Sequence, residues 1–260
     1  MPAAYTHYRF GKEVYRSLPV SVRKEIIQAL PLYKIGLQGP DILFFYRPLF
    51  KNKISSTGFQ MHTVSAEHFF DGAAQMVKNR KQLSYLLGFV CHFVLDSACH
   101  GFIEEYIQST GIGHSEIEME FDRMLMIKDG QDPTSCQIAK QIQASEENAE
   151  VIQGFFPMIP TKKIDKALRS MRFYTRLLTP TSSLKRKVLF GGMWLTGNYE
   201  KLHGMVINPK GNIACVESCI RLTELYEEAI QTAVDLICDY MKTIKEGKEL
   251  HQRFHRTFDA

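Results

Sequence analysis

Residues Lys81–Gln108 read KQLSYLLGFVCHFVLDSACHGFIEEYIQ, and this stretch decides the fold. It is apolar over most of its length, and it contains His92, Asp96 and His100 at intervals of four residues. Four residues advance an α-helix by about 400°, so the three side chains form one ladder of about 12 Å along a single face. Three ligand-type side chains on an apolar helix are costly to bury without a compensating charge. The stretch therefore predicts a core helix that carries a polar site.

The rest of the chain also has apolar residues at helical spacing. Further helices are predicted over 21–30 (ending near Pro31), 64–79, 114–127, 136–153, 162–178, 182–193 and 214–246, with a turn at 36–40. No alternating strand pattern, fixed-period repeat or low-complexity segment is present. We expect an all-α protein, a multi-helix bundle forming a single domain over residues 1–260.

Composition limits the classes of function. The chain has 260 residues, is 45% hydrophobic and 23% charged, and has a net charge of +4, which excludes a disordered or collagen-like protein. The charge is too small to indicate a nucleic-acid partner. No uninterrupted apolar run approaches about 18 residues, so no transmembrane segment is expected. The N-terminus lacks the pattern of a secretory signal, and we expect a cytoplasmic protein.

Other metal-ligand residues precede and follow the ladder. His114 and Glu118 form a second pair at i and i+4, which can hold one ion from a single helix face. Asp41 follows the turn at 36–40, His62 is expected just before a helix, and His7 lies near the N-terminus. Each has an ordinary structural explanation when taken singly, and the whole set could be buried histidines with structural ion pairs.

Taken in order, these positions resemble the ligand set of the zinc-dependent phospholipase C family and, more distantly, that of the secreted zinc nucleases that cut single strands. The resemblance covers about the first 120 residues, and its eight positions are His7, Asp41, His62, His92, Asp96, His100, His114 and Glu118.

The resemblance implies an all-helical bundle enclosing a trinuclear zinc site. Asp41, His62, His92 and Asp96 would bind the first ion, and His100, His114 and Glu118 the second. His7 and the bridging Asp96 would bind a third ion together with the N-terminal amine. Secreted members supply this amine from an N-terminal tryptophan, whereas the only tryptophan here is Trp194. Because initiator methionine is commonly removed before proline, we expect removal of Met1 and a role for Pro2 as the N-terminal ligand. If Met1 stays, the site would hold two zinc ions rather than three.

The activity implied is hydrolysis of a phosphate ester, such as a phospholipid, by a metal-activated water. Asp41 would be a ligand, or the catalytic group that takes the proton of the water. A nuclease or nucleotide phosphatase with the same cluster is the alternative, and a non-catalytic helical metal-binding or interaction protein is a second one. No specific nucleic-acid partner is inferred.

Substrate contacts are predicted from single residues. Phe44, Tyr46 and Phe59 could line a site for a headgroup or a base, although core packing is the ordinary explanation. His203 could reach the site from a late loop, or be solvated. The basic tail Lys242–Arg256 could make a weak peripheral contact with an anionic membrane, or be a solvated helix end.

Overall fold

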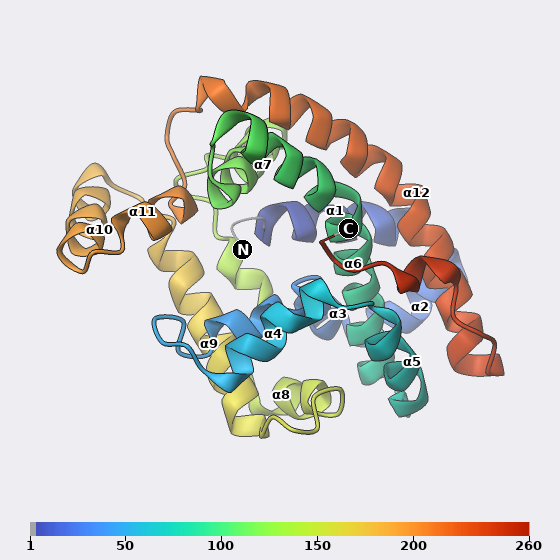
Figure 1. Ribbon diagram of the computed structural model, residues 1–260. Coiled ribbons are helices and arrows are strands. Elements are labelled where there is room, and N and C mark those ends of the chain that lie inside the picture. The colour runs from blue at the N-terminus through green and yellow to red at the C-terminus, as the bar shows by residue number, and fades with distance from the viewer. Residues whose placement is uncertain (1–3, 260) are drawn as a thin grey trace.

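The computed structural model describes residues 4–259, and every regular element in that range is a helix. The all-α prediction is therefore confirmed. Figure 1 shows the elements, which are α1 (Ala4–Ser17), α2 (Val20–Ile27), α3 (Leu30–Gly36), η1 (Gly39–Phe45), α4 (Lys53–Thr63), α5 (Glu67–Met76), α6 (Arg80–Thr110), α7 (His114–Lys128), η2 (Ile138–Gln141), α8 (Glu146–Gln153), α9 (Thr161–Leu177), α10 (Ser183–Leu195), α11 (Tyr199–Leu202), η3 (His203–Met205), η4 (Ile213–Cys215), α12 (Val216–Glu246) and η5 (Gln252–His255).

Helix α6 is the central element, and α3 and α12 pack against it. The side chain of Asn79 caps its N-terminus by accepting the backbone N–H of Gln82, and Gly111 ends it in the left-handed conformation. By length and composition α6 could cross a membrane, but 78% of its most apolar window is buried within the protein. Core helices have the same composition, and the face of α6 that carries His92 and Asp96 is enclosed by other helices.

Two glycines allow α3 and α6 to cross at backbone contact. A Cβ at Gly88 would lie 2.2 Å from the carbonyl oxygen of Tyr33, and one at Gly36 would lie 2.1 Å from that of Tyr85. Both distances are far below van der Waals contact with a backbone atom, so only glycine fits there without moving a helix. The close crossing matters because η1, which follows α3 directly, reaches the polar face of α6.

Four sequence-based boundaries differ from the structure. Pro31 lies at the start of α3 rather than at the end of the preceding helix, because proline is well tolerated in a first turn. The helix expected over 136–153 is divided into η2 and α8, with Ser145 capping α8. The helix expected from 64 begins only at Glu67. His62 does not precede a helix but occupies the last turn of α4.

The helix crossing generates a stability prediction. Gly88→Ala should lower the free energy of unfolding by about 1–3 kcal/mol, since the added methyl meets a backbone carbonyl. Gly72→Ala is the matched control, because Gly72 lies in α5 with nothing within 4 Å of the added carbon. It should raise the stability by up to about 1 kcal/mol through helix propensity. Guanidinium unfolding curves measure both, and equal effects of the two substitutions would contradict the crossing.

Candidate metal centre

The carboxylate of Asp96 is the centre of a buried ring of four histidines. Its Oδ2 lies 2.9 Å from Nε2 of His92 and 3.8 Å from Nε2 of His62. Its Oδ1 lies 3.2 Å from Nε2 of His7 and 3.8 Å from Nε2 of His100. Asp96 itself is 4% exposed. Each oxygen therefore faces a different pair of imidazoles, which is an arrangement that allows one carboxylate to bridge two cations.

Asp41 extends this cluster from η1. Its Oδ1 lies 3.1 Å from Nε2 of His62 and 3.9 Å from Nε2 of His92. The approach requires Gly39, which has φ +49° and whose absent Cβ would lie 2.1 Å from Cδ2 of His92. Any side chain at position 39 would therefore push η1, and Asp41 with it, away from α6.

A third group of ligand-type atoms forms where α6 meets α7. Oε1 of Glu118 lies 3.3 Å from Nε2 of His114 and 3.7 Å from Nε2 of His100. Ligand atoms lie within 4.8 Å of one another in each of three groups, namely His7 with His92 and Asp96, Asp41 with His62 and His92, and His100 with His114 and Glu118. The structure thus brings all eight predicted ligands together. Pro2 lies outside the described residues.

Hydrogen bonds hold three of the imidazoles with one nitrogen toward the cluster. Nδ1 of His62 is 2.8 Å from the carbonyl oxygen of Gly58, and Nδ1 of His92 is 3.3 Å from that of Leu37. A carbonyl only accepts, so Nδ1–H donates in both, and Nε2 of each ring faces the carboxylates. Nδ1 of His100 is 3.0 Å from Oδ1 of Asp259 in the same way. This second contact of each ring is typical of metal-binding histidine.

The residues fit a divalent metal because the buried ligand atoms are not satisfied by one another. Nε2 of His92 is buried and has no hydrogen-bond partner, although it lies 2.9 Å from Oδ2 of Asp96. A lone pair that faces a carboxylate oxygen without a shared proton is repelled by it, and a cation between them removes that repulsion. Imidazole nitrogen and carboxylate oxygen together are the donor set that zinc takes.

The ionisation of these groups follows their surroundings. Burial lowers the pKa of His92, so its imidazole stays neutral. Burial alone would raise the pKa of Asp96, but His92, His100 and His7 together hold it well below its usual value. Burial disfavours the charged form of His62 as well, yet the hydrogen bond and charge of Asp41 raise its pKa to about 9. Without a metal, the cluster is therefore an anionic carboxylate pair neutralised by protonated histidine.

The N-terminal helix is fixed to the site by Asp122, one turn beyond Glu118 on α7. Its carboxylate accepts the backbone N–H groups of Tyr5 and Thr6 at 3.1 and 2.7 Å, and the Thr6 hydroxyl at 2.5 Å. These N–H groups begin α1 and have no partner within the helix. Asp122 thus places α1, and with it His7, beside Asp96. Sequence reasoning missed it, although its i+4 spacing from Glu118 was a usable signal.

The C-terminal segment closes another side of the centre, and the sequence held no local sign of this. The backbone N–H groups of Phe258 and Asp259 donate to the carbonyl oxygen of His62 at 3.2 and 3.3 Å. Phe258 is fully buried, and its ring lies 5.9 Å from that of His92. In Figure 1 this segment returns to the middle of the molecule and ends beside α6.

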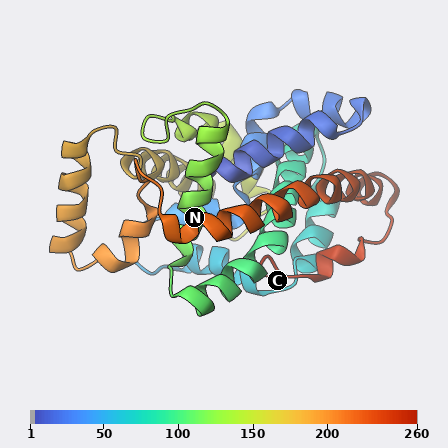
Figure 2. The same ribbon diagram turned by 90° about the horizontal axis from the view of Figure 1, so that it is seen from above.

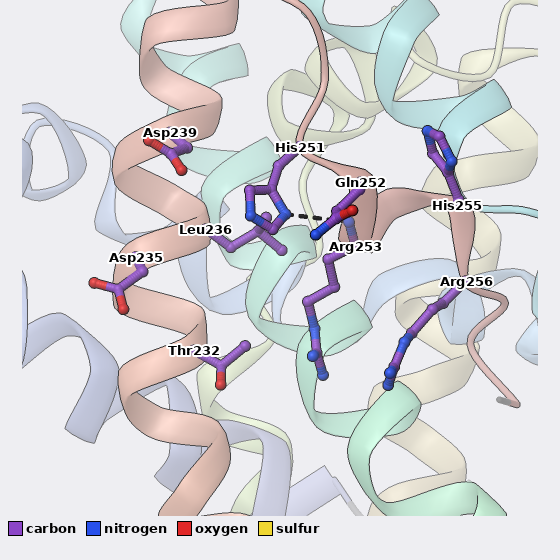
Figure 3. Close-up of a pocket in the computed structure, with 9 residues that line it drawn as sticks. All are labelled: Thr232, Asp235, Leu236, Asp239, His251, Gln252, Arg253, His255 and Arg256. Atoms are coloured by element: carbon purple, nitrogen blue, oxygen red, sulfur yellow. Dashed lines mark hydrogen bonds between the residues drawn. The ribbon is translucent and has the colours of Figure 1, made fainter.

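The basic tail is largely part of the fold. Phe254 is fully buried, with its ring 4.4 Å from that of Phe70, so it is not available to a membrane. Arg253 and Arg256 extend into a polar cleft beside α12, opposite Asp235 and Asp239 (Figure 3).

The predicted substrate residues lie in different surroundings. Phe44 stacks between Phe59 and His62, with ring centroids 4.1 and 5.3 Å away, and so lies beside the centre. Tyr46 is turned toward the cations of Arg47 and Lys166. His203 stacks on Tyr199 and lies 3.8 Å from Glu200, in a 3-10 segment that packs against α7.

Comparison with known proteins agrees with this geometry. A family model described as zinc dependent phospholipase C matches residues 6–161, a range that contains all eight predicted ligands. The chain belongs to the zinc-dependent phospholipase C family. No curated protein and no solved structure matches it. At the level of the family, this is a phospholipase C-like zinc hydrolase.

The contact between His100 and Asp259 generates a prediction. Asp259→Ala should weaken zinc binding at the His100 position by about 10–100-fold, because the ring loses the partner that orients it. Competition with a chromophoric chelator measures the affinity. Asp235→Ala, an exposed carboxylate on α12, is the control and should change nothing. Equal zinc affinity of the two variants would show that Asp259 does not position His100.

The raised pKa of His62 predicts how metal affinity depends on pH. A folded-state pKa of about 9 lies above the ordinary value of 6.5, so the proton stabilises the metal-free fold below pH 6.5 and ceases to do so as pH rises through about 9. Zinc must displace this proton. Apparent zinc affinity should therefore rise with pH, by up to about tenfold per unit between 6.5 and 9, in chelator competition corrected for the chelator's own titration. A flat profile would contradict the assignment of His62 as a ligand.

Proposed function

We propose that the protein hydrolyses a phosphate ester of the phospholipid type at a zinc cluster held by the eight residues named above. Two groups of candidate ligands share His92, Asp96 of the first group lies 3.8 Å from His62 of the second, and the third group lies around Glu118, which supports up to three ions.

One observation carries the proposal, and it is the division of the Asp96 carboxylate between two pairs of imidazoles. A structural ion pair needs one partner of opposite charge, and a single structural zinc needs one closed tetrahedral set. A bridging carboxylate with further ligands on both sides instead supports neighbouring ions, as in metal-assisted phosphoryl chemistry.

The bound ions would neutralise the phosphate oxygens and lower the pKa of water from 15.7 toward about 7. The chain's own residues provide the remainder. The neighbouring imidazoles of His92 and His62 hold the pKa of Asp41 below its usual value against the effect of burial, so its carboxylate is ionised at neutral pH. This carboxylate lies beside both imidazoles, and we assign to it the role of receiving the proton of the attacking water. Phe44 and Phe59 form an aromatic surface beside the reacting group.

The bridging role of Asp96 gives the decisive test. Asp96→Asn should abolish hydrolysis and remove most zinc from two positions, since an amide does not replace a shared carboxylate. His114→Ala should lower the zinc content by only about one ion per chain while circular dichroism stays helical. Elemental analysis and a panel of phosphate esters, including a phospholipid and a single-stranded oligonucleotide, provide the measurements.

Asp71→Asn, an exposed carboxylate in α5, is the control for Asp96→Asn and should retain both metal and activity. Full metal content and turnover in Asp96→Asn would refute the cluster. Cleavage of the oligonucleotide but of no lipid would favour the nuclease, for which the stacked Phe44 and Phe59 would hold a base.

A further inference from the structure

We propose that an open apolar groove between α9 and α10 binds the hydrocarbon chain of the substrate, while its phosphate lies at the metal centre. The groove has a volume of about 1020 Å³. Apolar side chains dominate its lining, among them Met171, Phe173 and Leu177 of α9, Leu184 and Val188 of α10, and Met205 of η3. This inference rests on the proposed function for the headgroup end.

Helix α10 forms the outer side of the groove and is held weakly by the rest of the chain. It lies at the edge of the molecule in both ribbon views (Figures 1 and 2), and Met193 is its only buried residue. Leu184 and Val188 are 71% and 67% exposed, and both line the groove. Their i, i+4 spacing places them on one side of the helix. Apolar surface of this extent, left open to water beside an apolar groove, indicates a site for an apolar ligand.

The inner end of the groove reaches the elements that carry the metal ligands. Ala4 lies one turn before His7 on α1, Phe45 lies one turn after Asp41 on η1, and Met119 follows Glu118 on α7; all three residues line the groove. The inner end of the groove therefore lies within about one helical turn of candidate ligands on three elements, although no ligand itself lines it. This proximity favours the hydrocarbon part of a phosphate ester as the occupant rather than a peptide.

The charged groups in the lining agree with a phosphate-bearing amphiphile. Arg176 and Lys185 line the groove, whereas Asp122 is the only carboxylate in its lining, and that carboxylate is occupied by the N-terminus of α1. Most of the apolar lining comes from residues 171–207, which follow the region 6–161 matched by the family model. Most of the apolar lining therefore lies outside the region that the family model matches.

The test separates chain binding from catalysis. Calorimetry with butyl, octyl and dodecyl phosphate, each below its micellar concentration, should give affinities for the zinc-loaded protein that rise about two- to fourfold per methylene until the groove is filled. In Val188→Asp, dodecyl phosphate should bind at least about tenfold more weakly and butyl phosphate unchanged. Leu195→Asp is the matched control, because Leu195 is 80% exposed on the same helix but does not line the groove.

A fluorescent fatty acid, 11-(dansylamino)undecanoic acid, probes the groove without chemistry. The wild type and Asp96→Asn should bind this probe with equal affinity, and Val188→Asp should bind it weakly. If no ester is hydrolysed but this pattern holds, the proposed function fails and the hydrocarbon site stands. If esters are hydrolysed but affinity ignores chain length and Val188→Asp has no effect, the groove proposal is overturned.

Two further outcomes would also overturn it. A dimer in sedimentation that becomes monomeric in Val188→Asp and excludes the probe would show that a second copy covers the groove. The second outcome concerns anionic phospholipid vesicles. If Val188→Asp and Leu195→Asp lose vesicle binding equally, while both still bind dodecyl phosphate, then α10 contacts a bilayer instead.

Discussion

The rest of the structure depends on the burial of one carboxylate. Asp96 lies in the middle of an apolar helix, where an isolated negative charge is very costly. Four imidazoles surround it, and they come from α1, from α4 and from two other turns of α6 itself. The helices must therefore converge at this point for the core to be stable. The candidate metal ligands around Asp96 and the packing of the bundle are consequently linked.

The convergence depends on positions where no side chain is present. Gly36 and Gly88 let α3 meet α6 at backbone contact, and Gly39 then admits the ring of His92 beneath η1. Without this crossing, Asp41 would not reach His62 and His92. Long-range polar contacts complete the arrangement: Asp122 holds the start of α1, and Asp259 holds His100 from 159 positions away in the sequence. Rigid placement of this kind is what a cluster of several ions needs, since each ligand must meet a fixed position.

The sequence predicted some parts of this site and not others, for physical reasons. The helical repeat places His92, Asp96 and His100 on one face, and His114 with Glu118 on another, so local spacing was sufficient for them. No spacing relates Asp41, His62 or His7 to α6, and only the family resemblance joined them. Helix α4, which carries His62, was not predicted, because the N-cap at Asn52 was not recognised. Asp259 and Phe258 carry no local signal at all, since their partners are set by the path of the whole chain. The groove was not predicted, because the sequence pattern of α10 is that of an ordinary amphipathic helix, whose apolar residues are expected to be buried in the core.

The candidate metal centre and the apolar groove would contact different parts of a substrate. A cluster of cations surrounded by imidazole and carboxylate attracts any phosphate ester, because charge and coordination do not depend on what the ester carries. Selection among esters must then come from contacts outside the cluster. Apolar contact supplies little directional preference but grows with the area that is buried. In the proposal made above, the open groove that begins at Ala4, Phe45 and Met119 would select by the length of the hydrocarbon attached to the phosphate, because a longer chain buries more apolar area against α9 and α10.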